Sequence, residues 1–256
     1  MFPIRDDNPQ INKPVATYAI IALNVLVWFL VQGMGSIESL NASICQYGLI
    51  PADLFNSSAT QAAQRMCALS NGSAWGGVVT SMFMHGGWMH IIGNMWFLFV
   101  FGDNVEDSMG SIRFAIFYLL CGLCAAAAQV AVQPASAIPM VGASGAIGGV
   151  MGAYIMLFPR VRVHMVVILV IIFWTFRVPA IAMLGYWIVV QFIGGLSSMG
   201  ASGGGVAFWA HIGGFVAGAI LVWLFKDEEL LLNHPYHGWQ QSADAADIWK
   251  KPQNRQ

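Results

Sequence analysis

The feature that most constrains this chain is a series of long segments without charge. Only 9% of its 256 residues are Asp, Glu, Lys or Arg, and 57% are hydrophobic. Several uncharged runs approach the ~20 residues that a helix needs to cross a bilayer. The pattern predicts a polytopic membrane protein with one membrane domain. Because the first eight residues contain Asp6 and Asp7 and no apolar core, we expect no cleavable signal peptide.

Six segments have the composition of membrane-spanning helices, which predicts an all-α membrane protein. We expect the spans at about residues 17–33, 88–101, 112–132, 144–158, 179–195 and 206–225. The membrane domain then covers residues 15–226, with a long outer loop at 34–84. Residues 1–14 form a polar segment before it. Residues 227–256 form a polar tail after it, which we expect to be disordered.

The region between the fourth and fifth spans is longer than one crossing requires. Residues 163–199 are nearly all apolar, and Arg177 and Pro179 interrupt them. We therefore expect residues 164–174 to form a hydrophobic loop or a re-entrant piece at the membrane surface.

The four cysteines fall into two pairs. Cys45 and Cys67 lie in the outer loop, where an oxidising compartment would let them form a disulfide, although two cysteines in a loop of unknown fold also leave free thiols open. Cys121 and Cys124 are spaced as CxxC but sit in an apolar segment among alanines. We expect burial there rather than redox chemistry.

The basic residues predict the orientation. Six spans put both termini on one side, together with every Lys and Arg except Arg65. By the positive-inside rule, both termini are cytoplasmic, as in the plasma membrane of a prokaryote.

With this topology, four polar side chains share one depth. Ser144, His211, His90 and Asn94 each lie near the start of a span that enters the membrane from the outside. Ionisable and amide side chains are costly inside a membrane and are commonly functional there. We expect all four in the outer third of the bilayer.

The glycines explain how two of these side chains could meet. Five glycines fall within residues 142–152, where each would weaken a soluble helix by up to ~1 kcal/mol. Gly148 and Gly152 share a helix face with Ser144, and Gly214 and Gly218 share one with His211. Faces of small residues let helix backbones approach closely in lipid, so we expect the fourth and sixth spans to pack through these glycines.

A serine hydroxyl needs a base, and His211 is the one available. Of the acids, only Glu38 and Asp53 lie on the outer side, both in the loop, so the expected pair is a Ser144/His211 dyad without a carboxylate. His90, Asn94 and the backbone N–H of Ser144 are candidate oxyanion donors. An aspartyl site lacks its two carboxylates within spans, and His85-Gly86 lacks the Glu of an HExxH zinc motif.

Three motifs resemble those of the rhomboid intramembrane serine proteases. They are Gly142-Ala143-Ser144-Gly145, similar to GxSG; Ala210-His211 followed by Gly213, Gly214 and Gly218, similar to AHxxG and GxxxG; and His85, His90 and Asn94, similar to HxxxxHxxxN. Trp75, Thr80 and Phe83 resemble the end of the family's first outer loop.

The resemblance covers about residues 15–226 and implies a six-helix bundle around a water-filled cavity that opens to the outside. It implies cleavage of single-pass membrane proteins in or beside their transmembrane helix, without a metal or other cofactor. The lipid bilayer is a further partner, and no nucleic acid is expected. By position, Ser144 is the nucleophile, His211 the base, and His90 and Asn94 oxyanion donors, with His85 supporting. The fifth helix and the nearby cap loop would gate substrate entry.

Two positions depart from the family pattern. Gly76 stands where many members have Arg, and Gly148 stands where several have a Tyr that stacks on the histidine. Another aromatic, such as Tyr186 or Phe215, would then have to hold His211. A non-proteolytic protein that binds membrane clients, and a metal site or transporter built on the histidines, are the alternative functions.

Overall fold

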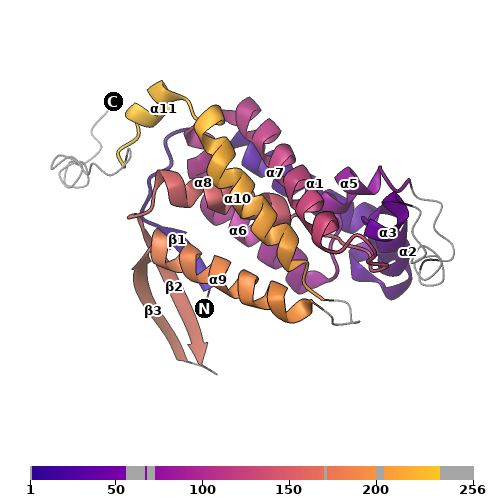
Figure 1. Cartoon of the computed structure of the whole chain (residues 1–256). Helices are drawn as coiled ribbons and strands as arrows, with labels where there is room; N and C mark the ends of the chain where they lie inside the picture. The colour runs from indigo at the N-terminus through magenta and orange to yellow at the C-terminus, as the bar shows by residue number, and fades with distance from the viewer. Residues whose placement is uncertain (1, 56–66, 68–72, 170–171, 200–204, 237–256) are drawn as a thin grey trace.

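The computed structural model describes residues 2–55, 67, 73–169, 172–199 and 205–236. Its body is made of long helices lying side by side (Figure 1). They are α1 (Val15–Leu30), α6 (Trp88–Asp107), α7 (Ser111–Val132), α8 (Ser144–Leu157), α9 (Ala180–Ser198) and α10 (Phe208–Phe225). Among the described residues, α7, α9 and α10 are long and apolar enough to cross a membrane, and α1 and α8 are shorter apolar helices.

Helix α8 lies at the centre of this bundle, and every residue from Gly145 to Tyr154 is buried. It runs beside α10 at a distance that only glycine allows. A Cβ atom added to Gly214 would lie 1.9 Å from the carbonyl oxygen of Gly145, and one added to Gly218 would lie 1.9 Å from that of Gly149. Backbone therefore packs directly on backbone, which is the arrangement that small residues permit between membrane helices.

The fold is mostly helical, but the prediction of an exclusively helical protein is wrong. Strands β1 (Phe2–Asp6), β2 (Arg162–Leu169) and β3 (Ile172–Pro179) form an antiparallel sheet in the order β1-β2-β3. The predicted hydrophobic loop at residues 164–174 is thus part of a β-hairpin. Its sequence is rich in β-branched and aromatic residues, which favour strands over a loop or helix, and the N-terminal segment provides the third strand.

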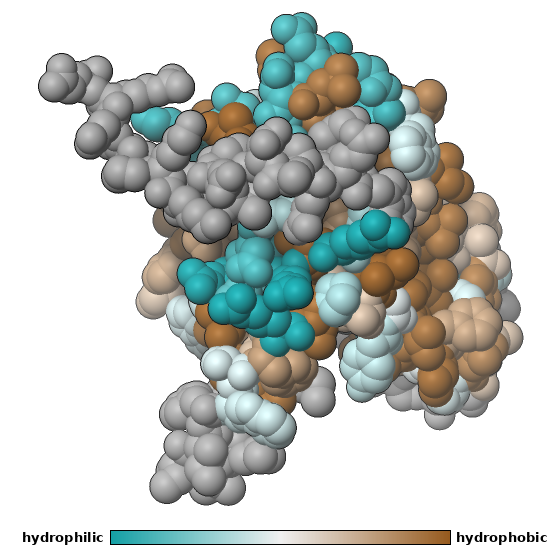
Figure 2. Space-filling model, turned by 90° about the vertical axis from the view of Figure 1, so that its left-hand side faces the viewer, coloured by the Kyte–Doolittle hydropathy of each residue, from teal (hydrophilic) through white to brown (hydrophobic). Residues whose placement is uncertain are grey.

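The sheet holds the first residues of the chain against the bundle. The carboxyl group of Asp6 accepts a hydrogen bond from the Tyr154 hydroxyl of α8. The Trp96 indole donates to the carbonyl of Pro3 at 2.5 Å, and His164 of β2 lies 2.6 Å from Asp7. Figure 2 looks onto the side of the molecule that carries the sheet and shows hydrophilic surface in the middle of that face, with hydrophobic surface along its right flank.

The outer region at residues 34–84, predicted as a loop, contains short helices where it is described. These are η1 (Gly33–Gly35), α2 (Ile37–Tyr47), α3 (Pro51–Leu54), α5 (Gly77–Thr80) and η2 (Ser81–Phe83). They lie at the opposite end of the bundle from the sheet (Figure 1).

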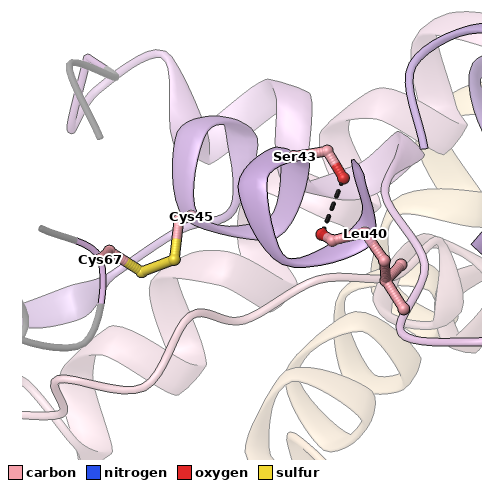
Figure 3. The surroundings of a disulfide bond; sticks show 4 residues. All are labelled: Leu40, Ser43, Cys45 and Cys67. Carbon is pink, nitrogen blue, oxygen red and sulfur yellow. Dashed lines mark hydrogen bonds between the residues drawn. A yellow bond between two sulfur atoms is a disulfide. The ribbon is translucent and has the colours of Figure 1, made fainter. Parts of the chain in front are cut away.

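The structure settles the question that the sequence left open about the outer cysteines. Cys45, near the end of α2, forms a disulfide with Cys67, as Figure 3 shows. In the same helix the Ser43 hydroxyl donates to the carbonyl of Leu40 at 2.9 Å. Of the other pair, Cys121 is buried as expected, whereas Cys124 is exposed.

Two carboxylates at the C-terminal end of α6 bind the beginning of α1 and the segment before it. Glu106 accepts hydrogen bonds from the backbone N–H groups of Ala16 and Thr17 at 2.9 and 2.8 Å, and Asp107 accepts from those of Ile11 and Asn12 at 2.7 and 2.8 Å. The donors bound by Glu106 are among those that a helix start leaves without partners, whereas Asp107 binds the segment just before the helix.

Helix α11 (Glu228–Leu232) follows α10 and occupies the beginning of the predicted polar tail. Its first turn is capped by Asp227, whose side chain accepts hydrogen bonds from Glu229 and Leu230. Both α11 and β1 lie at the end of the bundle away from α2 and α3 (Figure 1). Residues 237–256 of the predicted tail lie outside the described residues.

Candidate active site

Ser144 and His211 form a direct side-chain pair. Ser144 is the first residue of α8 and His211 lies in the first turn of α10, and the Ser144 Oγ atom is 2.7 Å from His211 Nε2. The start of α10 is held in turn by Gln129 of α7, whose amide oxygen accepts a hydrogen bond from the Ala210 backbone N–H at 3.2 Å. The close packing of α8 on α10 therefore continues up to a hydroxyl and an imidazole in hydrogen-bonding contact.

The other ring nitrogen of His211 contacts a side chain that the sequence analysis missed. His211 Nδ1 lies 2.7 Å from the Oε1 atom of Gln191, a buried residue of α9. An amide oxygen only accepts, so Nδ1 carries the proton. Nε2 of the neutral ring is then free to accept the Ser144 hydroxyl proton.

Trp187, one turn before Gln191, is also beside the imidazole. Its ring centroid is 5.8 Å from that of His211, and the two planes are inclined by 34°. Tyr186, which the sequence analysis suggested for this position, is exposed, and Phe215 packs on Trp187 with ring centroids 6.0 Å apart.

Gln191 could have been noticed in the sequence as the only amide side chain within the apolar sequence of α9.

His90 approaches Ser144 from α6. Its Nδ1 atom accepts a hydrogen bond from the Gly86 backbone N–H at 3.1 Å, so the neutral ring carries its proton on Nε2. That nitrogen lies 2.8 Å from the position that a Cβ atom would occupy at Gly142, and this position is 3.3 Å from Ser144 Oγ. Gly142 has a φ of +133°, which a side chain would strain. A glycine here keeps open a space that an N–H donor and the serine both face.

Asn94 lies one turn after His90 on α6 and lines the same cavity as Ser144, His211 and Trp187, with a volume of about 430 Å³. The Asn94 side chain is 8% exposed, and its NH₂ group has no hydrogen-bond partner among the described residues. A buried amide donor without a partner is costly, and it is available to an acceptor that enters the cavity.

His85 is fully buried behind His90, with the two ring centroids 5.3 Å apart. Its backbone is held by the side chain of Gln32: the His85 N–H donates to Gln32 Oε1 and the Gln32 amide donates to the His85 carbonyl, both at 2.8 Å. The His85 ring contacts His90 and does not line the cavity. Among the described residues, no three His, Cys, Asp or Glu side chains are grouped as a metal site.

The part of the chain that contains these residues is similar to known proteins. Residues 71–228 match the family model described as the Rhomboid domain, which is more than half of the chain. The chain is 31% identical over 166 residues to Rhomboid-like protein 11, chloroplastic, of Arabidopsis thaliana, covering 61% of this chain and 54% of that protein. It is 31% identical over 144 residues to Rhomboid protease GluP of Bacillus subtilis (strain 168), covering 56% of this chain and 25% of that protein.

A third relative, RHOMBOID-like protein 6, mitochondrial, of Arabidopsis thaliana, is 25% identical over 179 residues, covering 70% of this chain and 50% of that protein. The chain thus spans between a quarter and about half of the length of these curated relatives. The matched residues include Ser144, His211, His90 and Asn94, and the apolar helices α7, α9 and α10 are those of an integral membrane protein. This chain belongs to the rhomboid family.

Proposed function

We propose that the protein is an intramembrane serine endopeptidase that cleaves single-pass membrane proteins within or next to their transmembrane helix. One observation carries the proposal: the 2.7 Å contact between Ser144 Oγ and His211 Nε2 at a cavity that His90 and Asn94 also line. The name of the Bacillus relative, a rhomboid protease, supports the reaction class. Conversion of a serine into a nucleophile requires a base at this distance.

In this mechanism the Ser144 hydroxyl gives its proton to His211 Nε2 as Oγ attacks the scissile carbonyl carbon. The carbonyl oxygen becomes an oxyanion, which the Nε2–H of His90, the NH₂ of Asn94 and the backbone N–H of Ser144 stabilise. His211 then donates the proton to the departing amine. Water hydrolyses the acyl-enzyme through the same base, and the hydroxyl is restored.

The same proposal includes the topology. Six helices, α1, α6, α7, α8, α9 and α10, cross the membrane, and the cavity opens to the outer side. Both termini are cytoplasmic, in keeping with α11 and β1 at one end of the bundle (Figure 1) and with the distribution of Lys and Arg. The membrane is the plasma membrane of a prokaryote, and the disulfide at the opposite end suits an oxidising outer compartment.

The test is cleavage of a single-pass substrate by the purified full chain in detergent, with Ser144→Ala and His211→Ala as variants. We expect a cut product and fluorophosphonate labelling with the wild type, and neither with Ser144→Ala. Cleavage that persists in Ser144→Ala would refute the proposal. A wild type that binds membrane clients without labelling or cleavage would instead indicate a client-binding protein. A wild type that loses its function when a chelator is added would indicate a metal site.

A further inference from the structure

Helices α8 and α10 fix the distance between Ser144 and His211, but they leave the imidazole ring without support on one side. Gly148 of α8 faces the backbone of His211: a Cβ atom there would lie 3.0 Å from the His211 carbonyl oxygen and 3.5 Å from the Phe215 nitrogen. Glycine at position 148 has no side chain to stack on the imidazole, and a Cβ atom there would require the backbones to shift by a few tenths of an ångström. The ring must therefore be held from another helix.

Helix α9 provides this support with two side chains spaced i and i+4, which share one face of a helix. Gln191 Oε1 is 2.7 Å from His211 Nδ1, and the Trp187 ring lies 5.8 Å from the imidazole. Many residues of α9 are exposed. Gln191 and Gly195 are the buried residues of its C-terminal half. The C-terminal half of α9 also packs on Phe208 and Trp209 of α10, through Gly194 and Gly195, and Gln191 provides its hydrogen bond to His211.

We infer that Gln191 is the positioning residue of the proposed Ser144/His211 pair, taking the place of the carboxylate in a serine-protease triad. Its carbonyl oxygen fixes the proton on Nδ1, so that Nε2 always faces the serine as a base. It also stabilises the positive charge that the ring gains when it accepts the serine proton. Gln191 touches neither substrate nor reacting atoms and acts through His211.

The membrane explains why the third group is an amide. A carboxylate at the depth of His211 would require desolvation of a full charge, which is expensive in a bilayer, whereas a neutral amide oxygen accepts the same N–H at lower cost. No carboxylate of the described part of the chain hydrogen-bonds to His211. The Trp187 ring lies beside the imidazole, with the two ring centroids 5.8 Å apart.

The inference rests on the proposed function, and its test uses the full chain in detergent with wild type and Ser144→Ala beside every variant. Gln191→Leu keeps the volume and removes the acceptor, and Gln191→Glu restores an acceptor at the same reach. Val189→Ala, an exposed position on the same helix, controls for general disturbance of α9. The readouts are the rate of fluorophosphonate labelling of Ser144, and kcat and KM for a single-pass substrate.

We expect Gln191→Leu to lower kcat and the labelling rate by about 10- to 100-fold with KM nearly unchanged, as for loss of a hydrogen bond to a group that becomes charged. Gln191→Glu should recover most of the rate, and Val189→Ala should match wild type. Should Gln191→Leu fail to fold, Gln191→Met offers a more adaptable side chain of similar size, again without the acceptor.

A Gln191→Leu variant with the wild-type kcat, an effect confined to KM, or an equal loss in Gln191→Glu would each overturn the inference. These outcomes differ from failure of the proposed function, in which the wild type itself is neither labelled nor active, or in which Ser144→Ala remains active.

Discussion

The contact between α8 and α10 predicts a graded response to single methyl groups. In Gly218→Ala, the new Cβ atom would lie 1.9 Å from the Gly149 carbonyl oxygen and 2.5 Å from the Gly149 Cα atom. Since nonbonded heavy atoms rest ~3.5 Å apart, the two backbones must separate by roughly 1.5 Å. In Gly148→Ala the nearest atom is 3.0 Å away, and a shift of a few tenths of an ångström is enough.

We expect two measurable consequences for Gly218→Ala. Overpacking of this kind costs about 1–3 kcal/mol of stability or more, so the protein should unfold at a lower temperature in detergent. Because Ser144 and His211 sit on the two separating helices, the 2.7 Å contact between them should lengthen. A displacement of about 1 Å lowers the rate by roughly 10²-fold, which the rate of fluorophosphonate labelling measures.

The matched control is Gly185→Ala in α9, where a Cβ atom meets nothing within 4 Å. It should label at the wild-type rate and unfold at the wild-type temperature or slightly above it, because alanine favours a helix. Gly148→Ala should fall between the two. If Gly218→Ala behaves like Gly185→Ala in both measurements, close packing through these glycines does not set the geometry of the site.

Three further changes probe other parts of the structure. Asn94→Ala should lower kcat by about 10²-fold through loss of an oxyanion donor, with an unchanged unfolding temperature; an unchanged kcat would exclude that role. Cys45→Ser should lower stability by ~3 kcal/mol because the disulfide joins residues 22 positions apart, and addition of reductant to the wild type should have the same effect but none on the Cys45→Ser variant. Burial of Asp6 raises its pKa from 3.8 to about 7, so the folded protein retains this proton between those pH values and its stability should decline as the pH rises through that window. In Asp6→Asn this part of the pH dependence of the unfolding temperature should disappear, and an identical profile in both proteins would contradict it.

The sequence was sufficient for the helices because their uncharged runs have few alternatives in a membrane. The starts of α6 and α8 at Trp88 and Ser144 lie where the apolar patterns begin. Depth and helical spacing also led to Ser144 and His211, whose side chains the structure places 2.7 Å apart. In both cases the information is local in the sequence, or follows from the level at which a helix enters the bilayer.

Contacts between distant elements could not be predicted in this way. The sheet depends on pairing of residues 2–6 with residues 162–169, and a hydrophobic segment beside a membrane resembles a re-entrant piece more than a strand. The disulfide depends on the fold of the outer region. Gln191 contacts His211 because α9 turns that face toward α10, which no spacing within α9 reveals.

The hydrogen bonds of α1 bear on how the protein could be shortened. Its start is bound by Glu106 near the C-terminal end of α6. Gln32, just beyond the last turn of α1, holds the backbone of His85, which precedes the start of α6. Helix α1 and Gln32 therefore hold α6, which carries His90 and Asn94, by hydrogen bonds at both of its ends. Because α1 precedes the residues that match the family model, a fragment trimmed to 71–228 would keep Ser144 and His211 but lose the hydrogen bonds that α1 and Gln32 make at the two ends of α6. Domain boundaries drawn from similarity alone would thus remove the hydrogen bonds that hold both ends of the helix carrying His90 and Asn94.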